Sequence, residues 1–117
     1  MICITAIYPA ASGTRFDAGY YHRRHTPFAV ELLRPFDLIR LCVSEGIAAL
    51  DGSPPPYRMI SEMYFASREM FDAAFAACGE ALFADAANFT DIEPVLQVSG
   101  GVIDVAFDRH DFGVEAQ

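Results

Sequence analysis

Apolar side chains recur at two different intervals along the chain, and the changes between them predict the order of the elements. Residues 2–8, ICITAIY, are rich in β-branched and aromatic types and predict a short buried strand. Residues 57–65, YRMISEMYF, alternate with a period of two, which is typical of a strand with two unlike faces. Residues 36–44 and 95–107 predict two further strands.

Helical spacing separates these strands in two places. Over residues 15–33 the apolar positions fall three or four apart, and Pro27 is expected to bend or restart this helix, because a proline disfavours helical dihedrals at the preceding residue. A serine caps a second predicted helix over residues 68–78. Gly79 is expected to end that helix, with one or two further helical turns over residues 80–87.

The resulting order, β-α-β-β-α-β, predicts an α+β, ferredoxin-like fold: an antiparallel four-stranded sheet with both helices on one face. Residues 1–107 are expected to form this single domain, and residues 108–117 an acidic C-terminal tail. The other face of the sheet has no cover within one chain. We therefore expect a homodimer in which a second subunit packs on that sheet face.

The amino-acid composition limits the kinds of partner that the protein is expected to bind. The hydrophobic fraction of 53% leaves apolar surface for an interface or a pocket that binds a small apolar ligand. The net charge of −8 repels phosphate backbones, so we expect no nucleic acid. With no polybasic run, no long apolar stretch, no signal-peptide pattern and three widely spaced cysteines, we expect a cytoplasmic protein with no membrane association.

Four short motifs in order resemble the EthD-type domain family. They are the F-x-x-x-YY-x-x-x-H-x-P pattern of Phe16, Tyr20, Tyr21, His25 and Pro27, PY at 56–57, EMYFAS at 62–67 and ADAANFTD at 84–91. The resemblance implies a dimeric α/β-barrel, built from two ferredoxin-like units with their sheets face to face. Its wider superfamily includes muconolactone isomerases, cofactor-free quinone-forming monooxygenases, polyketide cyclases and haem-handling enzymes, and fold alone does not choose among these chemistries.

His25 is the main candidate for a catalytic residue. An imidazole gives and takes protons near neutral pH, and Tyr21, four residues earlier on the helix, lies on the same face and could position a substrate. The alternative is an ordinary histidine at a helix end that packs beside Pro27. The resemblance favours the catalytic role, since His25 stands at the recurrent histidine of the family.

Asp85 is the second catalytic candidate, because it lies among small and apolar residues. There it could orient His25, or act as a base with a raised pKa, or simply bond to nearby backbone in a turn. The substrate-binding candidates beside Tyr21 are Tyr8, Tyr57 and Phe89, with Tyr57 at the pocket rim. Aromatic residues at such positions also serve as plain core.

Motifs for other chemistries are missing from the sequence. The glycine pair at 100–101 is not a GxGxxG, no GxSxG occurs, and no clustered ligands predict a metal site, so we expect no cofactor. The function expected is a cofactor-free isomerase, cyclase or monooxygenase-like enzyme that acts on a small apolar catabolic or secondary-metabolite compound. Two alternatives stay open: a non-catalytic binding protein that serves an oxygenase system, and a haem binder that uses His25.

Overall fold

A computed structural model describes residues 1–107 and confirms the ferredoxin-like order of elements. The predicted tail, residues 108–117, lies outside the described residues. The elements are β1 (Ile2–Pro9), α1 (Ala18–Tyr20), the π-helical turn η1 (Tyr21–His25), α2 (Thr26–Leu33), the 3-10 turn η2 (Arg34–Phe36), β2 (Leu38–Glu45), β3 (Tyr57–Phe65), α3 (Arg68–Ala86) and β4 (Val95–Ser99).

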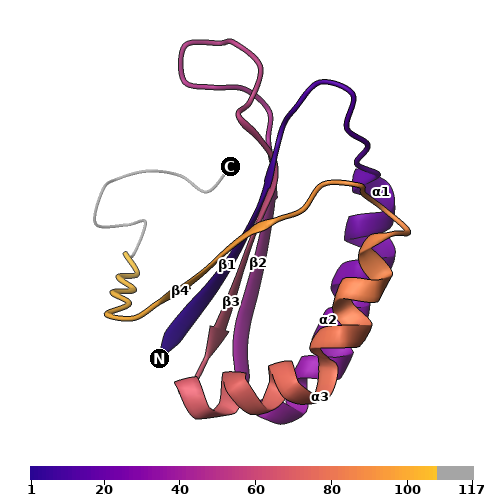
Figure 1. Ribbon diagram of the computed structural model, residues 1–117. Coiled ribbons are helices and arrows are strands. Elements are labelled where there is room, and N and C mark those ends of the chain that lie inside the picture. Colours follow the sequence, from indigo (N-terminus) through magenta and orange to yellow (C-terminus); the bar gives the residue numbers. More distant parts are fainter. Residues whose placement is uncertain (108–117) are drawn as a thin grey trace.

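The four strands form one antiparallel sheet in the order β2-β3-β1-β4. All helices lie on one side of it, and α3 runs alongside α1 and α2 (Figure 1). Two rows of side chains cross the helix-facing side of the sheet. The rows follow from the strand register: Val43, Ser61, Ala6 and Leu96 form one, and Leu41, Met63, Ile4 and Val98 form the next.

The buried residues fall into two clusters at opposite ends of this layer. One cluster joins the sheet to α2 and α3 and is centred on the wholly buried Phe65. The other joins the sheet to the start of the first helix and is centred on the wholly buried Phe89, which packs with Tyr8 and Tyr21. Where the two clusters meet, the helix-facing positions of the sheet include small residues, Ala6 of the second cluster and Ser61, so the layers are not filled there.

The first helix begins later than predicted and has an irregular middle. Asp17 caps it by accepting a hydrogen bond from the backbone N–H of Tyr20 at 3.0 Å. The turn from Tyr21 to His25 is π-helical, and the N–H of Thr26 donates to the carbonyl of Tyr21. A second helical segment, α2, begins beside Pro27 as predicted, and Pro27 stands in its first turn, where its missing N–H is tolerated.

Two predicted boundaries are wrong. Gly79 does not end the second helix, because its cost inside a helix is only about 1 kcal/mol and good helix formers follow it, so α3 continues to Ala86. The last strand stops at Ser99 rather than at residue 107. Ser99 pairs with Cys3, and β1 begins at Ile2, so hardly any backbone remains for a longer strand to pair with.

Candidate functional site

The first helix and α3 bring His25 and Asp85 together. His25 Nδ1 lies 2.8 Å from Asp85 Oδ2, and the two side chains are 12% and 14% exposed. The π-helical turn ends at His25, so the ring projects from the point where the helix changes its repeat. Such one-turn irregularities are frequent at functional sites. The convergence joins residues that are sixty positions apart in sequence.

Both carboxylate oxygens of Asp85 have hydrogen-bond partners. Its Oδ1 accepts hydrogen bonds from the Tyr20 hydroxyl at 2.7 Å and from Asn88 Nδ2 at 2.9 Å, while Oδ2 faces His25. Partial burial raises the pKa of Asp85, but hydrogen bonds from His25, Asn88 and Tyr20 outweigh burial, and the pKa ends below its usual value. Asp85 is therefore an ionised acceptor that orients the imidazole, and not a base with a raised pKa.

The carboxylate also decides where the proton sits on a neutral His25. An ionised carboxylate only accepts hydrogen bonds, so Nδ1 must carry the proton and Nε2 keeps its lone pair. Nε2 makes no hydrogen bond to any residue in the described part of the chain. The tautomer that results can accept a proton at Nε2, while Asp85 stabilises the imidazolium that forms.

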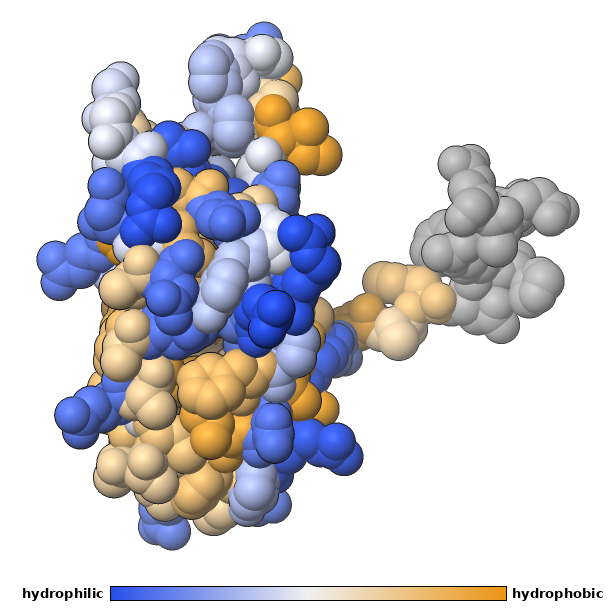
Figure 2. Space-filling view, turned by 90° about the vertical axis from the view of Figure 1, so that its right-hand side faces the viewer, coloured by the Kyte–Doolittle hydropathy of each residue, from blue (hydrophilic) through white to orange (hydrophobic). Residues whose placement is uncertain are grey.

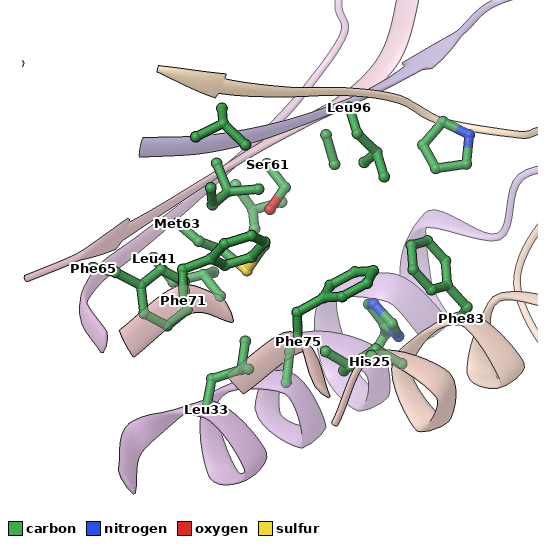
Figure 3. A pocket seen from close by; sticks show the side chains of 18 of the residues that line it. His25, Leu33, Leu41, Ser61, Met63, Phe65, Phe71, Phe75, Phe83 and Leu96 are labelled. Atoms are coloured by element: carbon green, nitrogen blue, oxygen red, sulfur yellow. The ribbon is translucent and has the colours of Figure 1, made fainter. Parts of the chain in front are cut away.

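His25 lines a cavity of about 380 Å³ between the sheet and the helices. The two side-chain rows of the sheet form one wall, and α2 and α3 form the other (Figure 3). Small residues make the space: Ala6 and Ser61 on the sheet, and Ala29, Gly79 and Ala86 on the helices. This volume lies within the range of small-molecule sites, and the walls are largely apolar.

An aromatic pair on α3 stands at the mouth of this cavity. Phe75 and Phe83 are 49% and 46% exposed, and their rings meet edge to face with centroids 5.8 Å apart. In Figure 3 these two rings flank the imidazole of His25, and Leu96 stands opposite on the sheet. Leu96 is itself 49% exposed although it faces the helix layer, so the cavity opens between α3 and β4. Figure 2 shows an apolar area on the lower half of the helix side of the molecule.

Two aromatic rings pack against the imidazole of His25. The ring of His25 lies 4.7 Å from that of Phe89 and 5.1 Å from that of Tyr21, between centroids. Tyr21 is buried and hydrogen-bonds with Ser61 and Tyr8; burial raises its pKa, although these two hydrogen bonds act in the opposite sense. Burial, together with Tyr21, also raises the pKa of Tyr8. Both phenols therefore stay neutral and able to donate hydrogen bonds near neutral pH.

Comparison with known proteins identifies the chain. The sequence profile of the EthD domain matches residues 14–93, which is more than half of the chain. The chain belongs to the EthD domain family. An EthD-like protein from Ralstonia eutropha JMP134 has a similar crystal structure, with a TM-score of 0.82 and 35% identity over 90% of this chain and 95% of that one.

More distant EthD and plant structures share the fold alone. An EthD family protein from Bacillus halodurans C-125 has a TM-score of 0.66 at 21% identity, covering 87% of this chain and 99% of its own. An Arabidopsis thaliana protein has a TM-score of 0.63 at 10% identity, covering 91% and 100%. No curated protein matches the chain significantly.

In this EthD domain the sequence-predicted site residues divide into three groups. His25, Tyr21 and Tyr8 line the cavity, and Asp85 contacts it through His25. Phe89 does not line the cavity but supports the imidazole from the core. Tyr57 lies away from the cavity, at a shallow hollow beside the loop that joins β2 to β3, so its predicted place at the pocket rim is wrong.

Three residues of the site were not singled out in the sequence, and only for Phe75 did the sequence hold a usable signal. Ser61 occupies a helix-facing position of β3, and only the strand register shows that it stands in the middle of the cavity wall. The helical repeat could have predicted that Phe75 lies on the same side of α3 as Phe83, which follows it by eight residues. Thr26 follows His25 directly, and its place in the cavity wall depends on the π-helical turn.

Other kinds of site find little support within residues 1–107. No group of three or more histidine, cysteine, aspartate or glutamate side chains in this range could hold a metal ion. Over the same residues, no helix is both long enough and apolar enough to cross a membrane.

Proposed function

We propose that this EthD domain is an acid/base enzyme that moves a proton on a small, apolar substrate held in the cavity, as an isomerase, a cyclase or a monooxygenase-like enzyme does. The observation that carries the proposal is the 2.8 Å contact of His25 with an ionised Asp85, made where His25 also lines an apolar cavity. The substrate class that fits such walls is a small catabolic or secondary-metabolite compound with few charges.

The roles of the residues follow from their positions. His25 Nε2 removes a proton from the substrate and later returns it, and Asp85 holds the imidazole in the tautomer that this needs. Tyr20 and Asn88 keep Asp85 in place. Tyr21 and Ser61 supply hydroxyl groups from the wall that could bind an oxygen on which charge develops.

The proposal is tested with a carbon acid of matching character. The cyclic ketone 2-tetralone is apolar, and base removes one of its C1 protons to give an enolate that takes deuterium from D2O. We expect the wild type to accelerate this exchange, followed by proton NMR. His25→Gln should lose about 10²- to 10⁴-fold of the acceleration. His22→Gln is the matched control, because His22 lies on the exposed face and pairs with Glu45. Equal loss in both variants would refute the role of His25.

The same experiment separates the alternative of a binding protein. A non-catalytic carrier or accessory protein of an oxygenase system would bind an apolar compound and release it unchanged. If the wild type binds 2-tetralone with a measurable Kd but gives no exchange above the uncatalysed rate, binding without turnover is the better description of this cavity.

Haem is a poor match for the residues of this cavity. A haem carries two propionates, and besides His25 the cavity wall offers one cationic side chain, Arg68, whose Nε already contacts Asp72 at 3.0 Å. Titration of the protein with hemin checks this directly. A Soret band that is absent in His25→Gln would favour haem binding over acid/base chemistry.

The partner we propose is a second copy on the open face of the sheet. The register aligns Ile60, Ile7 and Val95 as an apolar strip across that face. The segment after β4 exposes further apolar side chains, with Ile103 at 86% exposure. Light scattering during gel filtration should give twice the chain mass for the wild type and the single mass for Ile60→Lys. A wild-type monomer at micromolar concentration would refute the dimer.

A further inference from the structure

One hydroxyl of the residues that line the cavity is left without a partner. Thr26 follows His25 and lines the cavity, and its Oγ1 atom is buried with no hydrogen-bond partner within the described residues. One other buried side-chain atom of these residues, Arg58 Nε, has the same status, and Arg58 does not line the cavity. A buried hydroxyl without a partner is unfavourable, and such groups call for an explanation.

The local helix does not supply the partner. A threonine in a helix usually bonds the carbonyl three or four residues before it, which here would be that of Arg23 or His22, but the Thr26 hydroxyl makes neither bond. Helical threonine populates two χ1 rotamers, and a turn about χ1 can bring the hydroxyl to the position of the methyl group, which then takes the position of the Cβ hydrogen. The residue can in this way present its hydroxyl to the cavity next to His25.

We propose that Thr26 is a substrate-binding residue whose hydroxyl holds an oxygen atom of a flat aromatic ligand beside His25. The inference rests on the proposed function only in taking this cavity as the substrate site; it requires no turnover. The ligand oxygen is a phenolic hydroxyl or a carbonyl, since the threonine hydroxyl can accept from the first and donate to the second.

The walls of the cavity favour a flat aromatic ring over a bulky aliphatic group. Six phenyl or phenol rings contribute to the lining: those of Tyr8, Tyr21, Phe65, Phe71, Phe75 and Phe83. Aromatic rings offer faces and edges to which another ring binds with favourable geometry, and the sulfur of Met63, also in the lining, adds to this. Few polar groups stand among them, so a single ligand oxygen placed against Thr26 would also fix the orientation of the ring.

The test compares 1-naphthol with naphthalene, which lacks the oxygen, by ligand fluorescence at equilibrium. Thr26→Val replaces the hydroxyl with a methyl group of nearly the same shape. We expect wild type to bind 1-naphthol saturably and Thr26→Val to bind it roughly five- to tenfold more weakly, the effect of one hydrogen bond. Both proteins should bind naphthalene equally. Thr26→Ser, which keeps the hydroxyl, should bind 1-naphthol within about twofold of wild type.

Thermal unfolding separates binding from structure. Because the hydroxyl has no partner in the folded protein, Thr26→Val should unfold at the same temperature as wild type or higher. Equal affinity of wild type and Thr26→Val for 1-naphthol would overturn the inference, and so would the absence of saturable 1-naphthol binding by wild type. A failure of His25-dependent exchange would instead overturn the proposed function and leave this binding result standing.

Discussion

Replacing Asp85 with asparagine is expected to move the proton of the neutral His25 imidazole from Nδ1 to Nε2. The hydrogen bonds around the carboxylate decide how the new amide must lie. Tyr20 and Asn88 both donate to Oδ1, so the amide oxygen should stay at that position. The amide NH2 then faces His25 Nδ1, which must become the acceptor. The lone pair on the cavity side would be lost.

The size of the effect follows from what is kept and what is lost. Shape and all three hydrogen bonds remain, the one to His25 with its direction reversed, but the charge that strengthens the contact at 2.8 Å disappears. A charge-assisted bond exceeds a neutral one by about 1 kcal/mol, which in a domain of this size lowers Tm by roughly 4 °C. The loss of the base lone pair should cost much more in rate, about 10²- to 10⁴-fold in 2-tetralone exchange.

Nitrogen NMR of the histidine rings measures the tautomer directly. With ¹⁵N-labelled protein at a pH where His25 is neutral, the protonated nitrogen should be Nδ1 in wild type and Nε2 in Asp85→Asn. Asn88→Ala is the matched control, since it removes one donor to Asp85 but leaves the carboxylate opposite His25. If the Nδ1–H form persists in Asp85→Asn, or if Asn88→Ala changes the tautomer equally, the reasoning about Asp85 is refuted.

Three further predictions concern the cavity mouth and the response to pH. A Cβ atom at position 79 would lie 3.2 Å from the Phe75 ring, so Gly79→Leu should displace this ring and weaken naphthalene binding at least tenfold. Ala77→Leu, at an exposed position of the same helix, should leave naphthalene binding unchanged. Urea unfolding should show stability falling as pH rises above about 10, because unfolded tyrosines ionise there while Tyr8 and Tyr21 have raised pKa values; Tyr21→Phe should reduce the fall. Because the pKa of Asp85 is lowered in the folded protein, its carboxylate adds to the free energy of unfolding above about pH 3.8, and this contribution is lost as the pH falls below that value. If the stability of Asp85→Asn falls more steeply in acid than that of wild type, this prediction is contradicted.

The sequence predicts the fold well where a local pattern decides it. The alternation in YRMISEMYF places β3 at residues 57–65 as observed, and the element order leads to the observed sheet. The errors come from tertiary context. Gly79 interrupts no helix because its neighbours favour one, and β4 ends where β1 offers no further backbone.

The site was predictable in its centre and not at its edges. A histidine and a carboxylate in helices that share one sheet face are natural candidates, and the structure brings His25 and Asp85 together. Tyr57 follows a proline run that suggested a rim, but it stands at the start of β3 opposite Pro9 and lines the hollow beside the β2–β3 loop instead. Thr26 and Ser61 are unremarkable polar residues in sequence, because only the π-helical turn and the strand register bring them to the cavity.

Chemical rescue is the most direct test that His25 is the group that moves the proton. His25→Ala leaves a space beside Phe89 and Tyr21 of about the size of an imidazole ring. We predict that this variant loses 2-tetralone exchange by about 10²-fold or more and regains part of it, with saturation, when free imidazole is added. Exchange by His25→Ala at the wild-type rate without imidazole would contradict the account.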